Sequence, residues 1–400
     1  MISVEDGEAA VRHLGLRRVL LANPGADIYG SDLQMLESVR AMRAAGVEVV
    51  VVCPGPGPLV ELLNREGADV QVRTFPVVRR AHLSVPGMAR LAKDVLLAAP
   101  GMVRAIRDIE PDVVYVNTTT LPWWIGVSRL MRVPVLCHVH EAEDLDNIWI
   151  LRVLNAPLLL SSRLILISHT AAHATWRIYP SLRSRSVVVM NGIPDRASPP
   201  VPPPGVAGIT HLAVVGRLSP RKGTHTAIAA ARLLHERGLD VRLEVAGTVF
   251  PGYQWYEEEL RALVFQQGLS DVVSFTGYVS PSFIAFDRAD IVLAPSIREP
   301  FGNAVVEALL SERPVVAAAA GGHLETVLDG ETGLLVPVSD PVAAADAVES
   351  LIADPEAARR LASSARQSAR RAFGAGRYRR EVLEILTEMV GQTLDRQSRP

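Results

Sequence analysis

The sequence predicts an α/β protein built from two doubly wound domains, and three observations support this fold class. Short runs of valine, leucine and isoleucine alternate with helix-like stretches, as in parallel sheets covered by helices on both faces. A proline-rich segment at 198–205 interrupts this alternation, which restarts after it. A length of 400 residues also exceeds one ordinary core, because a domain averages about 150 residues.

The first half of the chain alternates strand-like and helix-like segments. It opens with a strand at 18–23, a helix at 31–45, a strand at 48–53 and a helix at 59–66. Further apolar strands are expected at 113–116, 133–139, 164–167 and 187–190. This order predicts one Rossmann-like domain over residues 1–197.

The second half repeats the pattern after a linker at 198–208. Strands are expected at 211–215, 241–246, 272–276, 291–294 and 315–318. These predict a second domain over 209–372, followed by a helical tail at 373–400 that we expect to pack back on the first domain. Because ligands bind at the carboxyl ends of parallel strands, two such domains predict a deep interdomain cleft.

Composition excludes several classes of protein. With 41 basic and 43 acidic residues, the chain is no global polycation, and we expect no nucleic-acid partner. The two cysteines, Cys53 and Cys137, exclude a disulfide framework and a four-cysteine zinc site. No signal peptide or membrane-spanning run is evident, so we expect a cytoplasmic protein. Among the basic residues, 39 are arginines and only Lys93 and Lys222 are lysines.

A basic glycine-rich loop follows the first strand of the second domain. Gly216, Arg217, Lys222 and Gly223 belong to this loop, and a helix is expected to start near Thr224. Cations beside a helix N-terminus form an anion site, because unpaired N–H groups and the helix dipole add to their charge. The alternative is an ordinary solvated loop.

Two glutamates are spaced eight residues apart around a second glycine. Glu299 precedes Pro300 and Gly302, and Glu307 lies in the helix that we expect to follow. Each carboxylate can accept hydrogen bonds from paired sugar hydroxyls. The alternative is that Glu299 is a simple helix N-terminal charge and Glu307 an exposed helix residue.

These motifs, in this order, resemble retaining glycosyltransferases of the GT-B architecture, family 4. The resemblance covers nearly the whole chain. The residues that carry it are the Glu299 and Glu307 pair with its Pro-Phe-Gly, the loop at 216–223, Asn191-Gly192-Ile193-Pro194, and Gly321-Gly322 with Glu325, Gly330 and Gly333.

The resemblance implies a nucleotide-sugar donor in the second domain. Arg217 and Lys222 would contact its diphosphate beside Gly216, Glu307 its ribose and Glu299 the transferred sugar. Backbone groups at Phe301, Gly302 and Asn303 would hold sugar and phosphate. Tyr278 would lie against the base, although packing explains it equally well. The donor is GDP- or UDP-linked, and the family implies neither a tightly bound cofactor nor a required metal.

In the first domain the resemblance places a glycine-rich loop and a histidine. Gly30 keeps the close backbone approach, whereas Tyr29 departs from the pair of glycines that many relatives have in this loop. His140 would lie near the reacting sugar, which makes Glu299, His140, Lys222 and Arg217 the expected catalytic set. His138 alternates with His140 and should point the same way. The composition of this segment could also suggest a metal cluster, whose members would be His138, Glu141, Glu143, Asp144 and Asp146, but the run lacks a defined ligand spacing. The alternative is a solvated loop or contacts to acceptor hydroxyls.

Residues 79–107 are basic and apolar, with a single acid, Asp94. This stretch predicts peripheral contact with anionic membrane, and Trp123, Trp124 and 148–151 are further exposed-aromatic candidates. The alternative is a pair of core-facing helices with arginines on their outer faces.

We therefore expect a retaining hexosyltransferase that moves a sugar from a nucleotide diphosphate to a hydroxyl of a lipid-linked or polysaccharide acceptor. Cell-envelope or exopolysaccharide biosynthesis, on the inner face of the plasma membrane, is the expected setting. The alternatives are a sugar-nucleotide epimerase, a glycoside phosphorylase, or a non-catalytic sugar-nucleotide-binding subunit.

Overall fold

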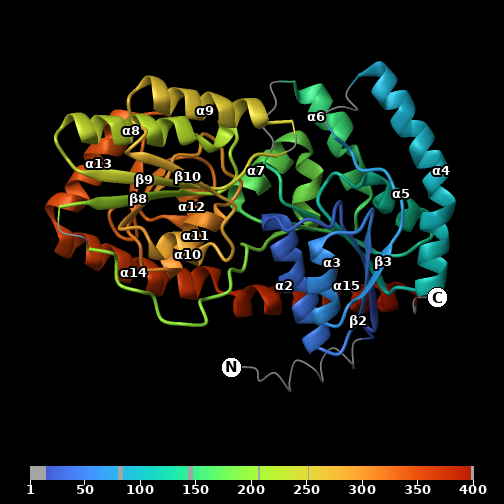
Figure 1. Cartoon of the computed structure of the whole chain (residues 1–400). Helices are drawn as coiled ribbons and strands as arrows, with labels where there is room; N and C mark the ends of the chain where they lie inside the picture. Colours follow the sequence, from blue (N-terminus) through green and yellow to red (C-terminus); the bar gives the residue numbers. More distant parts are fainter. Residues whose placement is uncertain (1–14, 80–83, 143–146, 206–207, 251, 398–400) are drawn as a thin grey trace. The chain divides into compact units, whose positions relative to one another are not determined.

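The computed structural model describes residues 15–79, 84–142, 147–205, 208–250 and 252–397 (Figure 1). The chain divides into two compact units. One contains the described residues up to Gly192 together with those from Ala375 onward, and the other is Ile193–Gly374. The domain and linker limits expected from the sequence stay predictions.

The first unit contains a seven-stranded parallel sheet in the order β3-β2-β1-β4-β5-β6-β7. Residues of β1 alternate between two cores: Leu20 pairs with Val50 and Val114 in the sheet and faces one core, while Leu21 faces the other. The strands are β1 (Arg18–Ala22), β2 (Glu48–Cys53), β3 (Asp69–Val72), β4 (Val113–Asn117), β5 (Val135–Val139), β6 (Arg163–Leu166) and β7 (Ser186–Val188).

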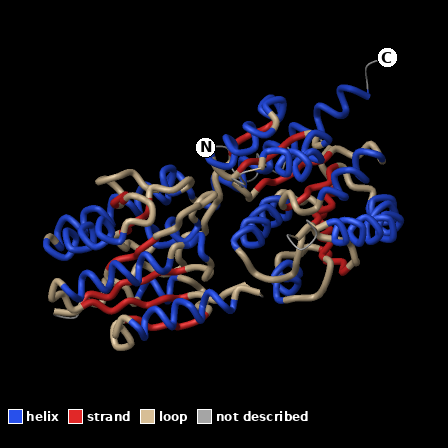
Figure 2. The backbone as a smooth tube through the Cα atoms, turned by 90° about the horizontal axis from the view of Figure 1, so that it is seen from above, coloured by secondary structure: helices blue, strands red, loops and turns tan. Residues whose placement is uncertain are grey.

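Helices cover both faces of this sheet, and Figure 2 shows them on either side of its strands. One core is formed with α2 (Gly30–Ala44), α3 (Pro58–Arg65) and α15 (Ala375–Gln397), and α15 lies beside α2 (Figure 1). The other is formed with α4 (Val85–Ile109), α5 (Pro122–Leu130) and α7 (His169–Ile178). The remaining helical segments are α6 (Ile148–Asn155), η2 (Ala156–Leu160) and η3 (Pro180–Arg185).

The second unit contains a six-stranded parallel sheet in the order β10-β9-β8-β11-β12-β13. Five of its strands, β8 to β12, match expected segments to within one residue at each end. The strands are β8 (Thr210–Val215), β9 (Val241–Ala246), β10 (Val273–Gly277), β11 (Ile291–Ala294), β12 (Val315–Ala318) and β13 (Leu334–Val336). Two parallel Rossmann-like sheets confirm the expected α/β fold class.

The helices of the second unit pack against this sheet and against one another. The main core of the unit includes α8 (Thr224–Glu236), α9 (Gln254–Gln266) and α13 (Pro341–Ala353). Helix α11 (Asn303–Leu310) packs against α14 (Pro355–Phe373) and β12. The shorter segments are η4 (Pro220–Lys222), α10 (Phe283–Asp287) and α12 (His323–Thr326).

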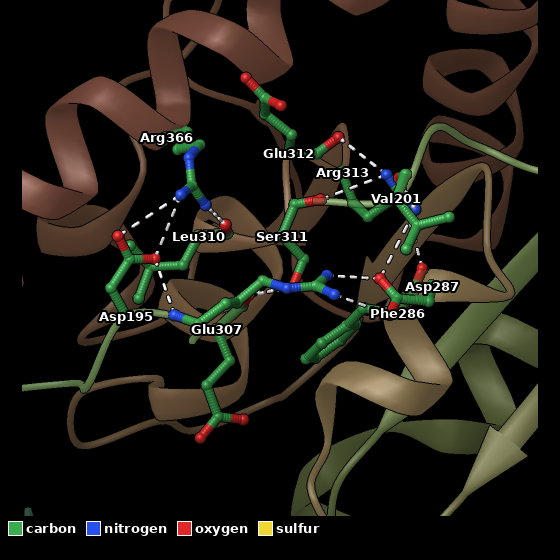
Figure 3. Close-up of polar contacts among 11 residues, drawn as sticks. Asp195, Val201, Phe286, Asp287, Glu307, Leu310, Ser311, Glu312, Arg313 and Arg366 are labelled. Atoms are coloured by element: carbon green, nitrogen blue, oxygen red, sulfur yellow. Dashed lines mark hydrogen bonds and ion pairs between the residues drawn. The ribbon is translucent and has the colours of Figure 1, made fainter. Parts of the chain in front are cut away.

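The fully buried Arg313 forms hydrogen bonds that hold the first residues of the second unit in place (Figure 3). Arg313 donates from Nε to the Phe286 carbonyl and from Nη2 to the Val201 carbonyl, both at 2.7 Å. The Asp195 carboxylate forms ion pairs with α14, one of them with Arg366 at 3.3 Å (Figure 3). Residues 195–201 are therefore held to the rest of the second unit at both ends. The Asp195 ion pairs hold one end, and the hydrogen bond from Arg313 to the Val201 carbonyl holds the other.

The strand order reverses at one point in each sheet, between β1 and β4 and between β8 and β11. Loops that leave such neighbouring strands in opposite directions open a crevice at their carboxyl ends, which is where doubly wound sheets bind ligands. Within the described ranges, no helix is both long enough and apolar enough to cross a membrane.

Candidate active site

The donor loop expected from the sequence lies at the β8/β11 reversal. Gly216 follows β8 with a φ of +143°, and a Cβ added there would meet no atom within 4 Å. Its backbone is therefore open to a ligand. The guanidinium of Arg217 lies 3.4 Å from the centre of the Phe250 ring, a cation–π contact that orients the side chain.

Gly223 brings this loop against β11. Its φ is +68°, and a Cβ would lie 2.0 Å from the Pro295 carbonyl oxygen, so only glycine fits. Helix α8 starts at the next residue without a side-chain cap. The Thr224 hydroxyl at this start is buried and has no hydrogen-bond partner in the described part of the chain. An uncapped helix start with an unsatisfied hydroxyl suits an anion.

Glu299 lies beside this helix start and is 8% exposed. Its Oε2 accepts hydrogen bonds from Lys222 Nζ at 2.5 Å and from Ser296 Oγ at 3.0 Å. Burial raises the pKa of Glu299, but the positive charges of Lys222 and Arg221 and the hydrogen bond from Lys222 outweigh burial and lower it to about 2. Glu299 is therefore a fixed anion at neutral pH.

The segment after Glu299 is tightly packed. Phe301 is buried, with its ring centre 5.6 Å from that of Phe373. Gly302 has a φ of +106°, and a Cβ there would lie 2.9 Å from His323 Cδ2. His323 is buried with Nδ1 3.0 Å from the Ala318 carbonyl oxygen, and burial lowers its pKa. A neutral His323 therefore donates that hydrogen bond.

Glu307 lies five residues into α11, as the spacing predicts, and is half-buried. Figure 3 shows its side chain pointing away from the contacts around Arg313. Burial raises its pKa to about 7, against the opposing effects of a hydrogen bond from Ser282 and the charge of Lys222. Nearby positive charges and hydrogen bonds therefore offset the burial of the Glu307 carboxylate less than they offset that of Glu299.

The structure brings together part of the expected donor set. One small pocket of the second unit is lined by Gly216, Arg217, Lys222, Glu299 and Gly302. Phe301, Asn303 and Glu307 flank this pocket in sequence but do not line it. Tyr278 follows β10 and is 63% exposed, so packing does not account for its ring.

His140 lies at the carboxyl end of β5 in the first unit. Its ring centre is 4.0 Å from that of His138, so the two side chains do point the same way. Burial lowers the pKa of His140 to about 3, and the ring is neutral at physiological pH. Gly30 is the first residue of α2, and Tyr29 is its N-cap, whose backbone N–H donates to the Asp32 carboxylate at 3.0 Å.

Sequence reasoning missed a chain of polar side chains that ends at His140. Asn117 Oδ1 lies 2.8 Å from His140 Nε2, and Asn117 Nδ2 donates to Asn23 Oδ1 at 2.7 Å. Asn23 Nδ2 donates in turn to Asp32 Oδ1 at 2.8 Å. The available signal was an asparagine at the carboxyl end of each of two apolar strand segments, β1 and β4, at the reversal of the sheet.

A separate pocket of about 120 Å³ opens beside β5 in the first unit. Its polar lining includes Thr119, Thr120, Glu141 and Asn155 over an apolar base that includes Val139. Of the residues considered for a metal cluster, Glu143, Asp144 and Asp146 lie outside the described residues. Within the part of the chain that the structure describes, no three histidine, cysteine or acidic side chains lie close enough together to hold a metal ion.

Residues 85–107 of the basic stretch belong to α4, which has one buried and one exposed side. Leu91 and Met102 are buried, whereas Met88, Leu96 and Leu97 are exposed. The expectation of an exposed Trp124 is wrong: it is fully buried, with its ring 5.5 Å from Phe75. Trp149 on α6 is 69% exposed, as expected.

Comparison with known proteins places this architecture. Residues 30–196 match the family described as Glycosyltransferase Family 4, and residues 210–368 match Glycosyl transferases group 1. The chain is 29% identical to a D-inositol 3-phosphate glycosyltransferase of Xylanimonas cellulosilytica, over 92% of this chain and 94% of that protein. It is 36% identical to an α-D-kanosaminyltransferase of Streptomyces kanamyceticus over 38% of each chain, so that match spans well under two thirds of the relative.

Among solved structures, the Anabaena protein HepE in complex with UDP-glucose superposes with a TM-score of 0.77 at 25% identity. The match covers 93% of this chain and 99% of HepE. Fold and site together define a glycosyltransferase of the GT-B class. Within that class, the chain belongs to the glycosyltransferases that combine a family 4 domain with a group 1 domain.

Proposed function

We propose that the protein is a retaining hexosyltransferase that uses a nucleotide diphosphate sugar. The observation that carries this proposal is the Lys222–Glu299 ion pair beside the uncapped start of α8. Lys222 and the start of α8 would attract a diphosphate, and Glu299 would offer a fixed carboxylate to sugar hydroxyls.

The electrostatics suit a departing diphosphate. As the bond between the sugar C1 and the phosphate oxygen breaks, negative charge grows on the leaving oxygen. Lys222, Arg217 and the N–H groups at the start of α8 would stabilise that charge without having to reorganise. Open backbone at Gly216 permits the close approach that this requires.

Glu299 is better suited to positioning than to covalent attack. Its Oε2 already accepts hydrogen bonds from Lys222 and Ser296, which weakens it as a nucleophile. We therefore favour displacement on the same face of the sugar. The acceptor oxygen bonds to C1, its proton passes to the leaving phosphate oxygen, and the anomeric configuration is retained.

We propose that the nucleotide of the donor is UDP or GDP. The similar HepE structure is a complex with UDP-glucose, which favours UDP. The exposed ring of Tyr278 offers a stacking surface for either base.

We propose a lipid-linked or polysaccharide acceptor in cell-envelope or exopolysaccharide biosynthesis. The pocket beside β5 presents hydroxyl, amide and carboxylate groups over an apolar base, a combination that suits a glycan. Exposed Leu96 and Leu97 on basic α4 suit the surface of an anionic membrane on its cytoplasmic side.

Thermal-shift titration with UDP- and GDP-sugars tests the donor site. Donor at about 100 times its Kd should raise the Tm by roughly 5 °C, because a ligand that binds only the folded state stabilises it. Lys222→Ala should remove most of this shift, and Lys93→Ala, on α4, should keep it. An equal shift in Lys222→Ala would refute the assigned site.

The products separate the alternatives. An isomerised nucleotide sugar would identify an epimerase, and a free sugar phosphate would identify a phosphorylase. Donor binding without hydrolysis or transfer to any acceptor would identify a non-catalytic binding subunit.

A further inference from the structure

The hydrogen bonds of the polar chain that ends at His140 can be donated in only one direction along the chain. Carboxylate oxygens only accept hydrogen bonds, so the Asn23 group that faces Asp32 Oδ1 at 2.8 Å is the amide nitrogen. The carbonyl oxygen of Gly25 lies 2.9 Å from the same nitrogen and requires the same orientation. Asn23 therefore presents its oxygen to Asn117.

The orientation of Asn117 follows from that of Asn23. Its amide nitrogen donates to Asn23 Oδ1 at 2.7 Å and also lies 3.4 Å from the Ser31 carbonyl oxygen. The remaining group, Asn117 Oδ1, faces His140 Nε2 at 2.8 Å. Because an amide oxygen only accepts, Nε2 must carry the hydrogen.

We propose that Asp32, Asn23 and Asn117 are positioning residues that hold His140 in its Nε2–H tautomer, so that Nδ1 accepts a hydrogen bond from a sugar hydroxyl. This rests on the proposed function and on the family resemblance, by which His140 would lie near the reacting sugar. A neutral imidazole has one donor and one acceptor nitrogen, so fixing Nε2 as the donor leaves Nδ1 as the acceptor. The ligand group recognised here is a hydroxyl donor, and a sugar that lacks it would lose this contact.

The neighbouring polar network is separate from this chain. Ser38 Oγ lies 2.6 Å from the Tyr378 hydroxyl and 3.2 Å from the Tyr115 hydroxyl, which bonds His138 Nδ1 at 2.6 Å. None of these atoms bonds His140. Ser38→Ala therefore matches Asn117→Ala as the loss of a buried polar group and leaves the chain to His140 intact.

Histidine ring nitrogen NMR of the full-length protein reads the tautomer directly and needs no substrate. The His140 signals are assigned among ten histidines by their loss in His140→Gln. We expect Nδ1 to resonate as an unprotonated nitrogen and Nε2 as a protonated one at neutral pH, in wild type and in Ser38→Ala. A protonated Nδ1 in the wild type would overturn the inference even if the protein proves to be a transferase.

Kinetics test the consequence. In Asn117→Ala the Nε2 hydrogen loses its acceptor, so we expect a mixture of tautomers and a kcat about tenfold lower, with the donor KM within twofold. Ser38→Ala should keep kcat within twofold. An unchanged kcat in Asn117→Ala despite mixed tautomers would overturn the positioning role. Absence of any transfer or donor hydrolysis by the wild type would count against the proposed function, and the tautomer result would still stand.

Discussion

Lys222 neutralises Glu299 in the free protein, so its removal has two consequences. Lys222→Ala leaves a carboxylate that is 8% exposed without its closest cation, and we expect a loss of roughly 1–3 kcal/mol in the free energy of unfolding. Transfer should fall at least about 100-fold, because the diphosphate charge loses a preorganised partner. Glu299→Ala should likewise abolish most transfer.

Denaturant unfolding and initial-rate assays measure these two effects. Lys222→Arg is informative beside Lys222→Ala, because a planar guanidinium restores the charge without the compact geometry of an ammonium. Near-normal turnover of Lys222→Ala or Glu299→Ala would contradict the role given to that residue.

Glu307 should make stability depend on pH in the direction opposite to Glu299. Its pKa rises from 4.5 to about 7 on folding, so the folded state binds the extra proton and stability falls as the pH rises through this window. Glu307→Gln removes this dependence. Because Glu307 is only half-buried, we expect Glu307→Gln to be more stable than wild type by roughly 1–2 kcal/mol at pH 8.

The gain should shrink as the pH falls towards 4.5, and urea unfolding at several pH values measures it. Donor affinity should decrease in the same variant if the carboxylate bonds the nucleotide ribose. A Glu307→Gln protein that is less stable than wild type at pH 8 would contradict the raised pKa.

Sequence motifs predicted the charged residues of the site but not the polar chain behind His140. Lys222 and Glu299 are recognisable because each lies in a motif with glycine and proline at fixed spacing. Asp32, Asn23 and Asn117 come from three separate segments, and their partners are set by the sheet order. Local spacing carries no information about contacts of that kind.

At the scale of elements, glycines shape the loops that enter α8 and α11. Gly302→Ala would place a Cβ 2.9 Å from the ring of buried His323 in a left-handed conformation. We expect a cost of about 1–2 kcal/mol and at least a tenfold loss of transfer, because the backbone around the expected sugar site must shift.

Gly238→Ala is the matched control for this prediction. Gly238 also has a left-handed φ, +84°, but a Cβ there meets no atom within 4 Å, and the residue follows the far end of α8. It should show a similar loss of stability with normal transfer. Equal transfer by the two variants in a rate assay would argue against a role for the Gly302 loop.

Helix α4 provides the test of membrane contact. Leu96 and Leu97 are 75% and 70% exposed, so Leu96→Ser/Leu97→Ser should leave the fold intact and weaken binding to vesicles that contain anionic lipid. Phe265→Ser is the control, since Phe265 is 79% exposed on α9 of the other unit. Vesicle flotation of wild type that does not depend on anionic lipid or salt would contradict the proposal.

Strand segments rich in valine were predictable, whereas the edge strands β3 and β13 and the burial of aromatic side chains were not. Strand β3 at the sheet edge reads Asp-Val-Gln-Val, which alternates polar and apolar residues over only four positions. Trp124 was an exposed-aromatic candidate two residues after Pro122, yet α5 places it in the core against Phe75. Local sequence cannot show which side of a short helix will be covered.

At the scale of the molecule, a repeated sheet topology places a candidate site in each unit. The β8/β11 reversal presents cations, a helix start and Glu299, while the β1/β4 reversal presents the chain to His140. Under the proposed function, the diphosphate and Glu299 sites belong to the second unit, and the polar chain that orients His140 belongs to the first. Substitutions at Lys222 should therefore change donor affinity, whereas those at Asn117 should change kcat alone.

Proton NMR of donor turnover tests the central claim most directly and requires no knowledge of the acceptor. With purified protein and UDP- or GDP-linked α-hexoses, water can replace the acceptor hydroxyl, and the first free sugar formed can be observed before its anomers equilibrate. We predict that the α-anomer appears first, together with nucleoside diphosphate, and that Lys222→Ala abolishes both signals. A β-anomer formed first, an isomerised nucleotide sugar, or turnover unaffected by Lys222→Ala would contradict the account.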